Sequence, residues 1–445
     1  MTNLLNFKFY INKIKSLDSL LFIVYFLVLI IFSKTYNLPL GLMDDFKNIS
    51  LVEQLKENPI ITYLNWNNER IFERGMIQPF YLLQVYIQYV SYKYFGAASV
   101  YILNGLILFC IFKYFINSLN LYGLNLSFTI SSLIFLIYPF TYDLFMFPSL
   151  QEKYIFLIYS FALRLVNSNK TRSKILFLII GLITPLIKLQ GAIFFISYFL
   201  IFLNLKNIKS LFLVVGSFFG ILAQGYVIFF LKTDYFVFDS NIMKLLDNLL
   251  NIYNLFFISI ILTSFLILKP YNLKNLNEVN ILGLMLSSFG LIFIYSNWYI
   301  VGYLVASYAF FLSVFLNLIL NYINIDLKFK LFLLISLVVA SSILFLTPRL
   351  ERWSDLNYFY LDISNNTYGD IYSCSSESSV WLNELQNKNT FQHINSIGEI
   401  QTNNYFIMQD DYQCESFIEN IGINCKLDNQ LKMNFEKIKI LKVSC

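Results

Sequence analysis

Charged residues are scarce in this chain. Asp, Glu, Lys and Arg make up 13% of its 445 residues, whereas apolar residues make up 57% and the mean hydropathy is +0.61. This composition is too apolar for a soluble globular protein and indicates a chain that crosses a membrane several times. The net charge of +5 is widely spread, and no basic block or basic-aromatic patch occurs, so a nucleic-acid partner is excluded.

Histidine and cysteine provide no metal-binding motif. The single histidine, His393, has no ligand partners at usable spacing, and no two cysteines form a CxxC pair. A metal site built on these side chains is therefore not expected. The P-loop and the GxGxxG, GxSxG and HExxH motifs are also absent, which excludes the soluble enzyme classes that these motifs mark.

Long apolar runs, in contrast, are abundant. Runs able to form membrane-crossing helices recur almost from the start of the chain to Leu346, and we predict about eleven spans. The first is predicted to be an uncleaved anchor, because no small-residue cleavage site follows it and further spans do. The predicted spans are 19–38, 97–117, 126–142, 151–166, 174–187, 190–204, 211–231, 250–268, 279–296, 299–320 and 331–347.

Basic residues orient these spans. Lys8, Lys13 and Lys15 precede the first span. With the N-terminus in the cytoplasm, about eleven spans place every basic short loop on the cytoplasmic side, as the positive-inside rule requires. The opposite side then carries the large loop 34–96 and everything after residue 348. The basic short loops are 167–174, 205–210, 269–278 and 321–330.

Residues 79–95 are nearly long enough to span, but counting them as a span would move most basic loops outside. Gln84, Gln88 and Ser91 recur at i, i+4 and i+7, which indicates one polar stripe on a largely aromatic helix. We therefore predict an amphipathic helix that lies in the membrane interface.

Residues 174–204 would form a single helix of ~46 Å, too long for the ~30 Å apolar core of a bilayer. Pro185 and Gly191 mark a break, so we predict two short or re-entrant helices. Lys188 lies within this break. A lysine at membrane depth is costly unless it faces a cavity or a partner, which indicates a functional role. The alternative is a lysine at a helix end whose ammonium group reaches the interface.

After Pro348 the composition becomes polar, with short β-like runs at 404–408 and 437–445. We predict a soluble α/β domain at 349–445, following a helical membrane domain at 1–348. Its cysteines are compatible with disulfides, in three alternative pairings, or with unpaired thiols. They are Cys374, Cys414, Cys425 and Cys445.

The large loop 34–96 opens with two adjacent carboxylates, Asp44 and Asp45, in the stretch GLMDDFKNIS. At a membrane surface, a carboxylate can act as general base toward an attacking hydroxyl. Paired acids can instead hold a divalent cation, or raise the pKa of one of the pair. The second outer loop brings further polar residues to the same side, namely Asp143, Gln151, Glu152 and Lys153.

The stretch LNWNNERIFERGMIQPF follows in the large loop, with Glu69, Arg70, Glu73 and Arg74. An arginine guanidinium group binds phosphate through two parallel hydrogen bonds, so these arginines are candidate phosphate ligands. In the alternative interpretation, the loop is solvated and its arginines pair with the two glutamates.

This arrangement resembles the GT-C glycosyltransferases, and among them the bacterial O-antigen-modifying glucosyltransferases. The resemblance lies in the acidic pair Asp44 and Asp45, the interfacial helices expected at 50–95 and the arginine-bearing stretch NNERIFERGMIQPF. At the level of topology it covers the whole chain, including a trailing outer domain. At the level of motif it covers the first outer loop.

The resemblance implies inverting transfer of a hexose, such as glucose, from a polyprenyl-phosphate donor to a glycan acceptor. The site would lie on the outer side of a bacterial cytoplasmic membrane, with Asp44 or Asp45 as catalytic base. No metal is required, although Mg²⁺ or Mn²⁺ is compatible with the acid pair. Ligands of the donor phosphate would be Arg70, Arg74, Lys153 and Lys188. Further contacts to the substrates would come from Glu69, Gln78, Glu152 and Gln190.

Two alternatives stay open. In a transporter or flippase of lipid-linked sugars, Lys188 and the acids would line a passage. Such a protein is expected to show two halves of similar hydropathy, which this sequence lacks. An O-antigen polymerase or ligase is the other alternative. Its large outer loop is expected in the middle of the chain, whereas here the large loop comes first.

Overall fold

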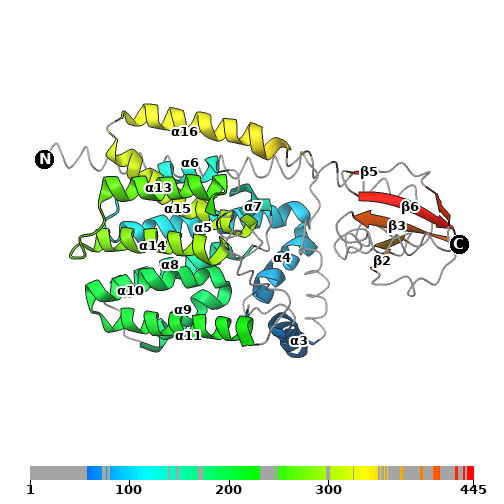
Figure 1. Ribbon diagram of the computed structural model, residues 1–445, viewed down its shortest axis with the longest axis horizontal. Coiled ribbons are helices and arrows are strands. Elements are labelled where there is room, and N and C mark those ends of the chain that lie inside the picture. The colour runs from blue at the N-terminus through cyan, green and yellow to red at the C-terminus, as the bar shows by residue number, and fades with distance from the viewer. Residues whose placement is uncertain are drawn as a thin grey trace.

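The computed structural model of the protein is mostly helical, with a β-sheet in the C-terminal region (Figure 1). The predicted first span, 19–38, lies outside the residues that the structure describes. Those residues are 58–72, 77, 81–138, 141–146, 150–168, 174–230, 246, 249–296, 301–323, 325–348, 351, 355, 358, 371–373, 391–393, 404–410, 426–428, 434–435 and 438–444.

Every predicted span after the first coincides with one or two helices. Three of these helices are long and apolar enough to cross a membrane, at Ser99–Asn120, Ile208–Val227 and Leu327–Phe345. The total of about eleven spans stays a prediction. The helices are α3 (Pro59–Phe72), α4 (Tyr81–Phe95), α5 (Ala97–Asn120), α6 (Phe128–Ile137), α7 (Thr141–Met146), α8 (Glu152–Asn167), α9 (Lys174–Ile187), η1 (Leu189–Ile193), α10 (Phe194–Leu205), α11 (Ile208–Phe230), α13 (Ile252–Leu268), α14 (Leu276–Ser296), α15 (Val301–Tyr322), α16 (Leu327–Ser341) and its π-helical continuation η2 (Ser342–Leu346).

The break predicted near Pro185 and Gly191 is confirmed. Helix α9 ends at Ile187, Lys188 is extended with φ −158° and ψ 147°, and the short 3₁₀ helix η1 leads into α10. Both α9 and α10 pack against α11. A Cβ atom on Gly191 would lie 1.9 Å from the carbonyl oxygen of Thr184. The break therefore needs a residue without a side chain at this position.

Polar side chains of helix α4 face the protein, whereas those of an amphipathic interfacial helix would face water. Gln84 is buried, and the Ser91 hydroxyl lies 2.8 Å from the Ser99 hydroxyl at the start of α5. The exposed side chains of this helix include Tyr94 and Phe95. The predicted polar stripe thus lies on the side of α4 that packs against the protein, where the Ser91 hydroxyl meets Ser99.

The loops predicted to share the cytoplasmic side gather at one end of the helical bundle. Amide and ammonium groups of one loop donate hydrogen bonds to backbone carbonyls of another. Because α8 ends and α9 begins at this end, the start of α8 and the break at Lys188 lie at the opposite end. The contacts are Lys209 Nζ to Ser168 O at 2.6 Å, Asn277 Nδ2 to Gly123 O at 3.0 Å, Asn321 Nδ2 to Asn125 O at 3.3 Å, and Asn204 Nδ2 to Leu273 O.

Helix α8 lies in the aromatic centre of the bundle, where it packs against α5 and α9. The rings of Phe156 and Phe310 are stacked with centroids 4.0 Å apart, and Tyr159 stacks on Phe194 at the same distance. Aromatic pairs of this kind contribute about 0.5–1.5 kcal/mol beyond the burial of their area. This packing fixes the axis of α8, and hence the position of its first turn.

The C-terminal strands form one sheet in the order β2-β1-β3-β6-β4, with β5 also paired to β6. β1 is parallel to β2 and β3, whereas β6 is antiparallel to its neighbours. Strands β3 and β6 coincide with the two predicted β-like runs. The α/β class and the cysteine pairing stay predictions, because the segments between strands and all four C-terminal cysteines lie outside the described residues. The strands are β1 (Ile371–Ser373), β2 (Phe391–His393), β3 (Asn404–Asp410), β4 (Lys426–Asp428), β5 (Asn434–Phe435) and β6 (Ile438–Ser444).

Replacing Gly191 by alanine is expected to destabilise the protein by about 1–3 kcal/mol, because the new methyl group meets backbone that must move. The measurement is the thermal unfolding midpoint of the detergent-purified full chain. Gly290→Ala is the matched control, since its Cβ would lie 3.5 Å from the Ile196 side chain, an ordinary contact. Equal midpoints for the two variants would contradict the close approach at Gly191.

Candidate functional site

The start of α8 is buried in the protein. Gln151, which precedes the helix, and the next two residues, Glu152 and Lys153, are all buried. Consecutive helical residues point about 100° apart, so no single face of the helix accounts for their burial. Charged side chains are rarely buried without partners, so this turn needs compensating groups from neighbouring elements.

Lys188 provides one such group by forming an ion pair with Glu152 Oε1. The Glu152 side chain is fully buried, whereas the Lys188 side chain is 17% exposed. The pair therefore lies at the edge of the bundle, with the ammonium group on the outward side. Within the described part of the chain, the second carboxylate oxygen of Glu152, Oε2, has no hydrogen-bond partner.

Asn104 on α5 positions the second lysine. Its Oδ1 accepts a hydrogen bond from Lys153 Nζ, while its Nδ2 donates to the carbonyl oxygens of Leu144 and Phe145 at 2.8 Å each. The two donated bonds fix which way the amide faces, and so hold its oxygen toward the ammonium group. Asn104 was not among the predicted site residues. A single amide within the apolar run VYILNGLILF was the available signal.

Gln190 is fully buried in η1, where its Oε1 accepts a hydrogen bond of 3.4 Å from the Ser307 hydroxyl on α15. The neighbouring Tyr308 donates to Asn254 Oδ1 on α13 at 2.7 Å. These contacts tie the break after α9 to two further helices. Gln190 is among the substrate contacts that the resemblance implies, whereas its partner Ser307 is not.

Gln224 on α11 connects the segment around Ile77 to this end of the bundle. Its amide exchanges two hydrogen bonds with the backbone of Ile77, of 3.3 and 2.9 Å, and Nε2 lies 3.3 Å from the carbonyl oxygen of Pro185. The backbone at Ile77 therefore lies beside the C-terminal end of α9, next to the break that carries Lys188. The sequence gives no specific signal for this contact.

The predicted site residues fall into three groups. The structure brings together Glu152, Lys153, Lys188 and Gln190 at the start of α8 and the break after α9. Residues 69 and 70 belong to α3, but their side chains lie outside what the structure describes. The remaining predicted residues lie wholly outside the described residues, and they are Asp44, Asp45, Arg74 and Gln78.

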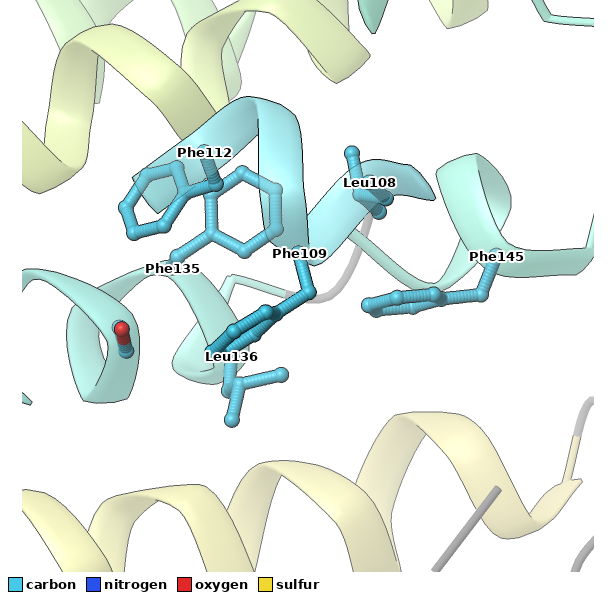
Figure 2. A pocket seen from close by; sticks show the side chains of 7 residues that line it. Leu108, Phe109, Phe112, Phe135, Leu136 and Phe145 are labelled. Carbon is cyan, nitrogen blue, oxygen red and sulfur yellow. The ribbon is translucent and has the colours of Figure 1, made fainter. Parts of the chain in front are cut away.

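A small apolar pocket lies between α5, α6 and α7, and Figure 2 shows its lining. Its volume of about 30 Å³ is enough for a water molecule. Six of its side chains are hydrocarbon, and the Ser132 hydroxyl is bonded to the carbonyl oxygen of Phe128 at 2.8 Å. Such a lining offers no group for proton or phosphate chemistry. The pocket is lined by Leu108, Phe109, Phe112, Ser132, Phe135, Leu136 and Phe145.

The cluster around α8 can bind an anion and orient polar groups. Glu152, Lys153 and Lys188 together carry one more positive than negative charge, and lysine ammonium groups bind phosphate as point charges. Among the described residues, no three His, Cys, Asp or Glu side chains lie close enough together to hold a metal ion. The acid pair suggested for a divalent cation lies outside those residues.

No family model, no curated protein and no solved structure matches this chain.

The ion pair is expected to respond unequally to removal of its two partners. Lys188→Ala leaves a fully buried carboxylate uncompensated, which costs about 3–5 kcal/mol. Glu152→Ala leaves a lysine that can still reach solvent, so it should lower the free energy of unfolding by less. The double variant should recover part of the loss caused by Lys188→Ala.

The measurement is thermal or denaturant unfolding of the full chain in detergent. Lys209→Ala, at the opposite end of the bundle, serves as the control for loss of a lysine. An equal or reversed order of the two single variants would contradict the assignment of Glu152 as the buried partner.

Proposed function

We propose that this chain is a membrane glycosyltransferase of the GT-C type. It transfers a hexose from a polyprenyl-phosphate donor to a glycan acceptor on the outer side of the cytoplasmic membrane. The observation that carries the proposal is the buried cluster of Lys188, Glu152 and Lys153, at the end of the bundle opposite the basic loops. Charged groups at such a depth are costly to keep and mark functional sites in membrane proteins.

The positive-inside rule supports this orientation. The loops around Lys209, Asn277 and Asn321 belong to the basic segments, and they share one end of the bundle. That end faces the cytoplasm in the proposal, so the cluster faces outward. The first span at 19–38 and the C-terminal domain at 349–445 complete the arrangement of about eleven spans with an outer domain.

In the proposed reaction, Asp44 or Asp45 removes the proton of the acceptor hydroxyl. The hydroxyl oxygen attacks the anomeric carbon, the bond from that carbon to the phosphate oxygen breaks, and the configuration inverts. The polyprenyl phosphate leaves with the electron pair of the broken bond. Its charge is neutralised by Lys188 and Lys153, with Arg70 and Arg74 from the first outer loop.

The contact of Gln224 with Ile77 and Pro185 supports a role for the first outer loop at this site. Ile77 follows Arg74 by three positions within the arginine-bearing stretch, and Pro185 precedes Lys188 by three. The backbone contact at Ile77, next to the break that carries Lys188, supports the proposal that Arg74 and Lys188 act on the same phosphate group.

Single substitutions Asp44→Asn and Asp45→Asn test the catalytic assignment. At least one is expected to lower hexose transfer by about a hundredfold or more, because a carboxamide cannot accept the proton. The measurement is glycan analysis of the surface polysaccharide, with protein amount checked by immunoblot. Lys209→Ala is the control for a charged residue far from the site.

Full glycosylation in both aspartate variants, at normal protein level, would contradict the proposed base. A wild-type protein that moves lipid-linked sugar across vesicles without forming a glycosidic bond would identify a flippase instead. Loss of long-chain polysaccharide with an unchanged hexose content per repeat would identify a polymerase or ligase.

A further inference from the structure

Two consecutive side chains at the start of α8 have hydrogen-bonding groups without a partner among the residues that the structure describes. Gln151 is only 4% exposed, yet within the described part of the chain neither its Oε1 nor its Nε2 has a partner. The Oε2 atom of Glu152 is also buried and unpartnered there. This small region therefore presents two acceptors and one donor.

Leaving these groups unsatisfied is costly. Most buried polar groups in proteins have a hydrogen-bond partner, and a lost partner costs the desolvation of the group. Gln151 also does not cap the helix that it precedes, so its burial brings no local benefit to α8. Three such atoms on adjacent residues indicate a place for a ligand.

The chemistry of the three groups selects the class of ligand. An anion would satisfy Gln151 Nε2 but would be repelled by the two acceptor oxygens. A cation would suit the oxygens, but it would lie near the Lys188 ammonium group, which is paired to the other oxygen of Glu152. A hydroxyl group both donates and accepts, so it matches donors and acceptors alike.

A ring with several hydroxyls suits these two residues better than a single water molecule. The side chains of Gln151 and Glu152 leave the helix about 100° apart, and one ring can offer a separate hydroxyl to each. Lys188, which contacts Glu152, is 17% exposed and so connects this region to the outside of the bundle.

We infer that Gln151 and Glu152 bind the hydroxyl groups of a sugar ring, beside the ammonium group of Lys188. The inference rests on the proposed function and names the residues that select the sugar. Lys188 contacts the phosphate end of the donor, while Gln151 and Glu152 read the hydroxyls of its hexose. A hexose lacking one of these hydroxyls leaves a buried polar group unpaired and is disfavoured.

The test uses the full chain purified in an amine-oxide detergent, because detergents with sugar headgroups would compete. The probes are glucose, galactose, mannose and N-acetylglucosamine, with inorganic phosphate in a parallel titration. We expect at least one sugar to raise the thermal unfolding midpoint of the wild-type protein. Gln151→Met, close in size but without the amide, should weaken its apparent affinity about tenfold.

Gln84→Met on α4 is the matched control, because it also removes a buried glutamine amide but lies on another element. Gln151→Asn, which keeps a shortened amide, is the second variant if Gln151→Met folds poorly. A sugar response that is equal in wild type and both Gln151 variants overturns the inference. A response to phosphate without a response to any sugar overturns it as well.

A transfer assay separates this inference from the proposed function. With donors carrying a hexose or a deoxyhexose, wild type should prefer the hexose, and the Gln151 variants should lose most of that preference. If these variants transfer sugar with an unchanged preference for the hexose donor, the sugar site is overturned and the proposed function stands. Sugar binding that depends on Gln151, in a wild-type protein without transfer activity, supports the site and overturns the function.

Discussion

The ion pair between Lys188 and Glu152 links the two irregular places of the helical bundle. One is the break after α9, and the other is the buried start of α8. A buried carboxylate needs a cation. Lys188 provides it from an extended backbone conformation at the point where helix α9 has ended. That break in turn depends on Gly191, whose missing side chain lets η1 approach Thr184. Packing, backbone conformation and charge at this end therefore depend on one another.

Polar contacts between helices stabilise the interior of the bundle. In a membrane, helices gain little from burying apolar surface against one another, so close packing and hydrogen bonds matter more. Tyr159 contacts Ser197 at 2.7 Å and donates to Asn280 at 3.1 Å, joining α8 to α10 and α14. Gly181 and Gly216 bring α9 and α11 into backbone contact. These interactions keep the helices of the site in fixed positions.

Much of this architecture could be predicted from the sequence, for identifiable reasons. Hydropathy locates helices such as α11, because a segment able to cross a membrane is apolar along its whole length. Pro185 and Gly191 reveal the break, and Lys188 stands out as a charge within it. The partners of Gln224 and Asn104 could not be predicted, because they lie far away along the chain and any carbonyl can accept from an amide. Periodicity also reveals the polar stripe of α4, but it does not determine whether that stripe faces the protein or the surroundings.

At the end of the bundle opposite the ion pair, carbonyl oxygens accept all of the hydrogen bonds described between loops. Carbonyl acceptors tie the loops together without neutralising any ammonium group. Lys209 thus contributes to folding through a hydrogen bond to a neutral acceptor. In the proposed orientation, this leaves its ammonium group available to the phosphates of lipid headgroups. The same basic residues would then orient the chain during insertion and anchor the folded protein to the bilayer surface afterwards.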